Sequence, residues 1–473
     1  MKKLLIIPTL LMVLASCNKD LSNLNIDTKH ASTAPSYTLF SNGVRNLADY
    51  MATPNVNTNV FQLITQQWTE VTYTDESNYD LGTRAIPDRW WRGMYKQALI
   101  NFQTAKDLIP TDVTDPGQQK NELAITDIMQ VFTWSVLVNT FGDIPYTEAL
   151  DPDNLFPKYD DAKTVYFDLL TRLDTSIAAL DPAASGFGSD ADLVYGGDVE
   201  KWIMFGNSLK LRLGMIIADF DAAKSKSVVE SAAPNVFTSN TDNASFAYTA
   251  ITPNVNPVWG ELVQSGRDDY APATTLINLM NTLNDTRRPF YFNDVDGKYV
   301  GGQPGAASAG PTIARPSTKV AQPDLPYLFL SYAEVEFALA EAVERGYNVG
   351  GTAAEHYTNG VTASMEYWGV SSANIAAYLA QPSVAYATAT GDYKQKIGTQ
   401  KYLALYMDGF DAWTEIRRLD FPKLAVPVDA QSGFPVRYPY PVNEQNLNSA
   451  SWSSAAAAIG GDKVETKLFW DKF

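Results

Sequence analysis

Histidine and cysteine, which most often serve as catalytic bases, nucleophiles and metal ligands, are scarce in this chain. Its 473 residues include only His30, His356 and Cys17 of these types. A Ser-His-Asp or Cys-His arrangement would rest on His356 alone, because His30 lies in a polar stretch near the N-terminus. Zinc and other metals bound by nitrogen or sulfur need more such ligands. The sequence therefore predicts no catalytic residue and no cofactor of this kind.

Carboxylates are plentiful, with 53 Asp and Glu residues in the chain. Residue types alone therefore leave open a glycoside hydrolase with a paired acid and base. The candidate pairs are Asp268 with Asp269, Asp75 with Glu76, and Asp294 with Asp296. Their hard oxygen ligands would also suit a structural calcium ion. Acidic loop pairs on an acidic protein are nevertheless usually just solvated.

Two loop-rich stretches carry aromatic rings beside amide, carboxylate and guanidinium groups. Sugars present apolar CH faces to such rings and hydroxyl groups to such polar side chains. We therefore predict that one stretch binds ligand through Trp259, Arg267, Asp268, Asp269 and Tyr270, and the other through Trp68, Tyr73 and Tyr79. The alternative is that these rings cover the helical frame, because large aromatic residues also dominate protein cores.

The N-terminus has the form of a secretory signal. Two lysines precede an apolar run of about eleven residues, which is shorter than the roughly 20 that a spanning helix needs. The segment LASC at residues 14–17 is similar to a bacterial lipobox, in which the cysteine is lipidated and becomes the mature N-terminus. We predict a signal peptide over 1–16, then a lipidated Cys17 with a flexible tether over 17–36. An ordinary signal peptide with a chance cysteine is the alternative.

The chain is strongly acidic. Its formal net charge at pH 7 is −17, and it becomes −19 if residues 1–16 leave with their two lysines. Such a charge argues against nucleic acid and against an anionic membrane surface as partners.

Helical periodicity dominates two segments, about 86–220 and 326–420. Apolar residues recur at steps of three and four after the N-cap candidates Asp160 and Asp198. The stretch from Leu123 to Val138 is apolar nearly all round, which predicts a central helix.

Capping boxes begin at Ser331 and Thr352, and a last long helical stretch is expected from about Tyr393 to Arg418. A helix that starts every 35–40 residues or so suggests stacked helical hairpins, although the tetratricopeptide consensus itself is not legible.

Loop residues dominate the other three segments, 37–85, 221–325 and 421–473. We predict that residues 37–473 form a single domain, with the helical segments as its frame and these three segments as a variable lobe. Binding residues usually lie in loops that a rigid frame supports.

Several motifs along the chain resemble those of the SusD/RagB family. They are FGDIPYTEAL at 141–150, YGGD at 195–198, NSLKLRL at 207–213, YAEVEF at 332–337, GTQKYLAL at 398–405 and AWTEIRR at 412–418. The matches extend from about Trp90 to Asn446 and are in the family's order. They are weakest over 221–325, which limits what can be inferred about the ligand.

The resemblance implies a mainly α fold, in which tetratricopeptide-like helical hairpins form a frame and a loop-rich lobe packs on it. It implies a protein without enzymatic activity, held to the outer membrane by lipid on Cys17 and facing the cell exterior. Such proteins bind nutrient oligomers, glycans above all and otherwise peptides, and deliver them to a SusC-like TonB-dependent transporter. A lipoprotein glycoside hydrolase and a structural or adhesive surface lipoprotein are the alternatives.

Charged residues in the matched motifs are expected to stabilise the frame rather than to contact ligand. We predict ion pairs for Arg212, Glu334, Glu336, Lys401, Arg417 and Arg418.

Overall fold

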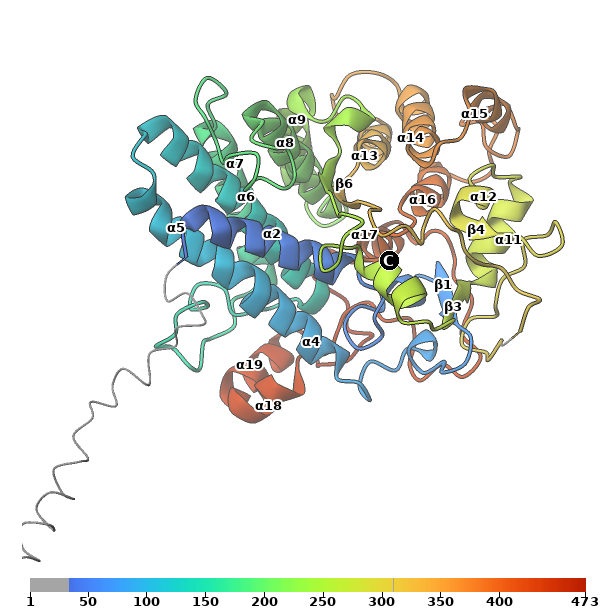
Figure 1. The fold of residues 1–473 in the computed structure, drawn as a ribbon, viewed down its shortest axis with the longest axis horizontal. Helices are drawn as coiled ribbons and strands as arrows, with labels where there is room; N and C mark the ends of the chain where they lie inside the picture. Colours follow the sequence, from blue (N-terminus) through green and yellow to red (C-terminus); the bar gives the residue numbers. More distant parts are fainter. Residues whose placement is uncertain (1–33, 309) are drawn as a thin grey trace, which may run out of the picture. The chain divides into compact units, whose positions relative to one another are not determined.

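The chain is mainly α, as predicted (Figure 1). The computed structural model describes residues 34–308 and 310–473. The predicted signal peptide, Cys17 and most of the predicted tether lie outside the described residues, and Ser36–Phe473 forms one unit. Within the described residues, no helix is both long enough and apolar enough to span a membrane.

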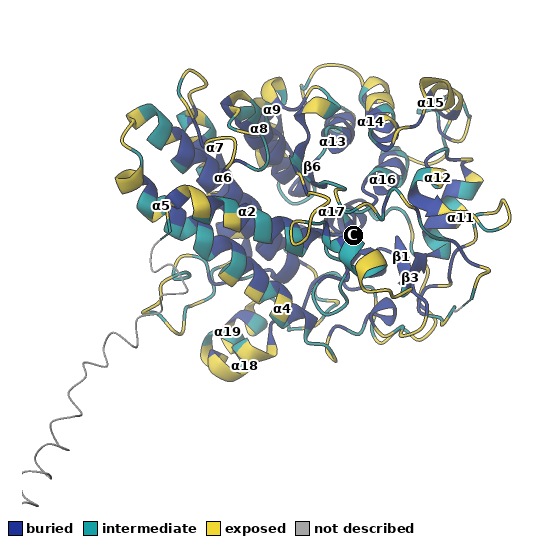
Figure 2. Cartoon of the chain, in the orientation of Figure 1, coloured by how far each residue is buried: buried dark blue, intermediate teal, exposed yellow. Residues whose placement is uncertain are grey.

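Helices packed as successive hairpins form the N-terminal half of the frame (Figure 1). Their bounds are α4 Ile86–Arg92, the π-helical segment η4 Gly93–Leu99, α5 Ile100–Asp112, α6 Pro116–Phe141, α7 Ala162–Ala179, α8 Val199–Ile216 and α9 Ala222–Ala232. Helix α6 packs against both α5 and α7, and it is buried along most of its length (Figure 2). This confirms the prediction of a central helix, which followed from its nearly uniform apolar surface.

Aspartate side chains begin several of these helices. Asp198 accepts a hydrogen bond from the backbone N–H of Lys201 at the start of α8, as predicted. The predicted cap Asp160 is wrong by one residue, because Asp161 caps α7. The Asp160 carboxylate instead accepts hydrogen bonds from the backbone N–H groups of Tyr146 and Thr147.

The C-terminal half of the frame contains α13 Tyr332–Glu344, α14 Ala353–Trp368, α15 Ser372–Leu379, α16 Tyr393–Ala404 and α17 Gly409–Leu419. The capping box at Thr352 is complete. At Ser331 only half of the capping box forms. The Ser331 side chain accepts from the backbone N–H of Glu334, but the Glu334 carboxylate contacts Arg212 instead of the Ser331 backbone. The long helical stretch expected over 393–418 is in fact two helices, which are separated at Met407 by a left-handed backbone with φ of 73°.

Buried ion pairs join the two halves of the frame. Arg212 on α8 contacts Glu334 on α13 at 2.6 Å and Asp411 on α17 at 2.9 Å. A single guanidinium therefore holds three helices together.

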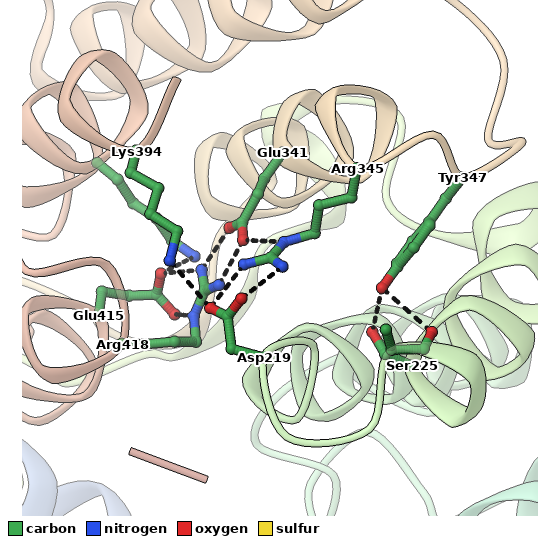
Figure 3. A network of polar contacts seen from close by, with 10 residues as sticks. Asp219, Ser225, Glu341, Arg345, Tyr347, Lys394, Glu415 and Arg418 are labelled. Atoms are coloured by element: carbon green, nitrogen blue, oxygen red, sulfur yellow. Dashed lines mark hydrogen bonds and ion pairs between the residues drawn. The ribbon is translucent and has the colours of Figure 1, made fainter. Parts of the chain in front are cut away.

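A second buried network lies between α13, α16 and α17 (Figure 3). Arg418 contacts Glu341 and Glu415, each at 2.6 Å, and Lys401 contacts Glu415 at 3.1 Å. Arg345 extends the network from Glu341 to Asp219, which follows α8. These contacts confirm the ion pairs predicted for Lys401 and Arg418.

The ion pair predicted for Arg417 is wrong, whereas Glu336 does have a partner. Arg417 forms no salt bridge among the described residues. Its guanidinium donates to the carbonyls of Asn139 and Val436 and lies 3.4 Å from the centre of the Trp413 ring. Burial lowers the pKa of Arg417 to about 9, because no carboxylate pairs with it closely. Glu336 pairs with His356 at 2.7 Å, so this histidine belongs to the frame.

The segments predicted to be loop-rich contain more helix than expected. They hold α2 Ser36–Ala52, α3 Phe61–Ile64, α10 Pro257–Trp259, the π-helical segment η7 Gly260–Gln264, α11 Thr274–Thr282, α12 Arg288–Tyr291, α18 Val442–Leu447 and α19 Ser449–Ala458. Helix α2 belongs to the frame, because its apolar stripe, which includes Phe40, Val44 and Leu47, packs against α5. Helices α18 and α19 are largely exposed (Figure 2).

In the part of the chain that the structure describes, the strands are short and form three two-stranded antiparallel ladders. These ladders pair β1 Trp68–Glu70 with β3 Tyr270–Pro272, β2 Ala244–Phe246 with β6 Tyr327–Leu330, and β4 Phe292–Asn293 with β5 Arg315–Pro316. The first of these ladders positions the candidate site.

Candidate ligand-binding site

The ladder of β1 and β3 brings together the two loop stretches that were predicted to bind ligand. Glu70 pairs with Tyr270 at one end of the ladder, and Trp68 pairs with Pro272 at the other. The backbone N–H of Val71 donates to the carbonyl of Asp269 at 2.9 Å, which carries the pairing one residue further. Residues that follow β1 therefore lie beside residues that precede β3.

A polar pocket of about 130 Å³ opens to solvent at this end of the ladder. It is lined by Asn55, Val56, Asn57, Glu70, Tyr73, Arg84, Glu261, Arg267, Asp269 and Tyr270. Four of the eight predicted ligand-binding residues are in this lining: Tyr73, Arg267, Asp269 and Tyr270. Two stretches that are about 200 residues apart thus form one site.

The exposed groups of the pocket provide one aromatic ring and several hydrogen-bonding side chains. The Tyr73 ring is 63% exposed. Arg267 contacts Asp269 at 2.5 Å, and the Asn55 amide donates to Glu261 at 2.6 Å. An accessible ring beside amide, carboxylate and guanidinium groups can stack on a sugar face and bond to its hydroxyl groups.

A buried carboxyl group forms part of the pocket wall. Glu70 accepts hydrogen bonds from the backbone N–H and the hydroxyl of Ser77, at 2.9 and 3.0 Å. Burial raises the pKa of Glu70 to about 8, and the neighbouring Glu76 carboxylate adds to the shift. Glu76 is itself buried and contacts Arg84 at 2.5 Å. Glu70 therefore carries its proton at neutral pH in the folded chain.

Replacing Glu70 by glutamine should remove a decline in stability between about pH 4.5 and pH 8. The unfolded chain ionises this group near its ordinary pKa of 4.5, whereas the folded chain retains the proton up to about pH 8. The free energy of unfolding therefore falls as the pH rises through this window, because the unfolded chain releases a proton that the folded chain retains. One pKa unit corresponds to about 1.4 kcal/mol, and because Glu70 borders a pocket that is open to solvent, which weakens the effect, we expect a total of about 3 kcal/mol.

Urea unfolding at pH 4.5 and pH 8 measures this difference between wild type and Glu70→Gln. Glu366→Gln is the control, because Glu366 is exposed on α14 and should change neither value. Parallel pH profiles for wild type and Glu70→Gln would contradict the prediction.

Three of the predicted binding rings lie in the interior, so their faces are not open to a ligand. The Trp68 indole N–H donates to the Tyr406 hydroxyl at 3.0 Å. The Tyr79 hydroxyl accepts from the Gln66 amide at 3.1 Å. Tyr270 donates to the carbonyl of Pro54 at 2.7 Å and packs against Trp68. These three rings belong to the core, in agreement with the alternative that the aromatic residues of these stretches cover the frame.

Asp268 and Trp259 do not line the pocket. Asp268 contacts Arg315, which lies on β5, at 2.5 Å. Trp259 is half-buried at the end of α10. Among the described residues, no group of three or more His, Cys, Asp or Glu side chains could hold a metal ion.

Sequence reasoning did not single out Asn55, Asn57, Glu70 and Arg84. Asn55 and Asn57 follow Pro54, and such a cluster indicated only a turn. Glu70 and Arg84 lie in the loop-rich stretch that was predicted to bind, but neither residue type nor spacing distinguished them. Their places in the pocket depend on the β1–β3 pairing, which the local sequence does not encode.

The fold consists of helical hairpins that support an accessible polar pocket, an arrangement typical of a binding protein. Residues 27–441 match a family model described as SusD-like, "starch-binding associating with outer membrane". The chain therefore belongs to the SusD-like family, whose members are glycan- or nutrient-binding proteins of the outer membrane rather than enzymes.

Solved structures agree with this assignment. A SusD homologue from Bacteroides uniformis is 28% identical, with a TM-score of 0.78 over 92% of this chain and 99% of that one. A protein described as chitin-binding is 26% identical, with a TM-score of 0.79 over 93% of this chain and 100% of that one. A Bacteroidetes SusD-like protein with 22% identity has a TM-score of 0.82, over 93% of this chain and all of the other, and shows the same fold. No curated protein matches the chain.

Proposed function

We propose that this protein captures a glycan oligomer in the pocket at the end of the β1–β3 ladder. The observation that carries the proposal is that this pairing places the exposed Tyr73 ring beside the Arg267–Asp269 pair. Glu261 and Asn55 supply further polar groups. A peptide is the second ligand class, since the same groups can bond to its backbone.

Chitin fragments are the first glycans to test. A structural relative at 26% identity is described as chitin-binding, and so is a SusD homologue from Flavobacterium johnsoniae at 24%. A chito-oligosaccharide offers apolar ring faces to Tyr73 and amide and hydroxyl groups to the polar wall.

The proposal extends to how the protein is held and what receives its ligand. A lipid on Cys17 would anchor the chain in the outer membrane, after removal of residues 1–16, with the tether over 17–36 leading to the domain. We propose that the protein faces the cell exterior and passes its ligand to a SusC-like TonB-dependent transporter. The lipobox-like segment and the ordered family motifs support these steps.

Replacing Tyr73 by alanine should weaken binding of the preferred oligomer about tenfold, because the exposed ring face is lost; a tenfold change corresponds to about 1.4 kcal/mol. Isothermal titration against chito-, starch-derived and peptide oligomers identifies the ligand and then measures the change. Tyr37→Ala is the matched control, because Tyr37 is also exposed but does not line the pocket.

Arg267→Met should also weaken binding, because it removes charged hydrogen bonds to the ligand. Equal affinities for wild type, Tyr73→Ala and Arg267→Met would place the ligand elsewhere. If no oligomer in the panel binds, a structural or adhesive role would be favoured instead.

A further inference from the structure

A second cavity lies in the C-terminal half of the frame, and it shares no lining residue with the pocket described above. It lies between β6, the ends of α13 and α14, and the connection from α16 to α17. Its interior volume of about 50 Å³ has room for about three or four water molecules. The side chains that matter for its chemistry are Tyr327, Tyr367, Trp368, Tyr406 and Asp408.

The Tyr327 side chain lines this cavity, and its hydroxyl group makes no hydrogen bond to the described residues. Tyr327 is only 4% exposed. Buried hydroxyl groups are nearly always satisfied in folded proteins, by protein, water or ligand. The Tyr327 hydroxyl therefore indicates a missing partner inside the cavity.

Asp408 is the one charged residue in the described part of the cavity lining. Asp408 begins α17, where its side chain accepts from the backbone N–H of Asp411 at 3.4 Å. Asp411 and Glu334 share Arg212, and the nearby Lys401 contacts Glu415 at 3.1 Å. Asp408 therefore has no cationic partner of its own among the described residues.

Asp408 lies deep in the fold, yet it is half-buried rather than sealed, because it lines the cavity. Burial, followed by the charge of Asp411, raises the pKa of Asp408 well above its ordinary range, and a cation beside this carboxyl group would favour its ionised form. The left-handed backbone of the preceding Met407, with φ of 73°, is a sparsely populated conformation for a residue with a side chain. Such strain is found most often at functional sites.

We propose that this cavity binds a primary ammonium group, with the Asp408 carboxylate as its counter-ion and the Tyr327 hydroxyl as an acceptor. Trp368 and Tyr367 line the cavity, and the Lys319 ammonium already lies 5.6 Å from the centre of the Trp368 ring, a contact of the kind that an organic cation makes. The Asp408 carboxylate would repel an anion. Among residues 34–308 and 310–473 no cluster of acidic, His or Cys side chains suits a metal ion.

The small volume limits what can enter to the ammonium end of a ligand. An amino sugar and the N-terminus of a short peptide both present this group. Glucosamine and glycinamide distinguish the two sources, and N-acetylglucosamine is the neutral counterpart of the first.

Titrating the full chain with these three probes, by calorimetry or by NMR, tests the proposal. Saturable binding of glucosamine or glycinamide, without binding of N-acetylglucosamine in this cavity, is the expected result. Asp408→Asn keeps an N-cap side chain on α17 and removes the charge, so it should weaken binding at least about tenfold. Asp392→Asn is the matched control, because it makes the same change at the exposed N-cap of α16.

Tyr327→Phe keeps the buried ring and removes only the hydroxyl, and it should weaken binding even if Asp408→Asn does not fold. Failure of both ammonium probes to bind would overturn the proposal, and so would unchanged affinity in both variants. Tyr73→Ala should leave binding of the ammonium probes intact, so this test is independent of the glycan pocket.

Discussion

Replacing Arg418 by methionine is expected to lower the free energy of unfolding by about 3–5 kcal/mol, because it leaves two carboxylates buried without their main partner. Arg418 is 3% exposed and contacts Glu341 and Glu415, each at 2.6 Å (Figure 3). Burial alone would raise the pKa of Glu415, but Arg418 and Lys401 lower it to about 2. The network is therefore stable only while its charges remain balanced.

Urea unfolding of wild type and Arg418→Met at pH 7 measures this effect. Arg267→Met is the matched control, because Arg267 likewise pairs with a carboxylate, that of Asp269 at 2.5 Å, but is exposed. Its loss should change the free energy of unfolding little. Adding Glu341→Gln to Arg418→Met should restore part of the stability, since Glu415 then keeps Lys401 and Arg345 keeps Asp219 as a partner. An unchanged unfolding midpoint for Arg418→Met would show that the pair contributes nothing.

Replacing Cys17 by alanine is expected to move the protein from the membrane fraction to the soluble fraction. Each buried CH₂ of an acyl chain contributes about 0.8 kcal/mol, so more than one chain gives durable anchoring. The apolar run before Cys17, at about eleven residues, is too short to serve as a transmembrane anchor in its place.

Fractionation of the expressing bacterium, with detection of the chain in each fraction, measures this effect. Ser16→Ala is the matched control, because it keeps a small residue before the cysteine and should leave the protein in the membrane fraction. Retention of Cys17→Ala in that fraction would mean that something other than lipid holds the protein there.

The frame could be predicted from the sequence because its signals are local. Asp198 and Thr352 cap helices as their spacing indicated. The apolar surface of α6 predicted its central position, since a helix that is apolar all round must be buried. Helix α2 was missed, although its apolar stripe is regular, because the surrounding stretch is rich in loop residues. The break at Met407 was also missed, although the Asp408-Gly409 dipeptide that follows it is a turn signal.

The candidate site could be predicted only in part. The sequence singled out Tyr73, Arg267 and Asp269, which line the pocket, but also Trp68 and Tyr79, which are interior. An aromatic ring in a loop-rich segment has the same local signature whether it covers the core or faces a ligand. Exposure distinguishes the two cases, and exposure depends on packing.

By itself, therefore, the sequence determined the helical frame, the acidic charge and the family, because periodicity, capping and motif order can be read over a few residues at a time. The tertiary structure alone decided which side chains share a site. The β1–β3 ladder joins segments about 200 residues apart, and the cavity beside Asp408 is walled by β6, α14 and the start of α17. Such long-range contacts form only when the whole core packs, so no local pattern specifies them.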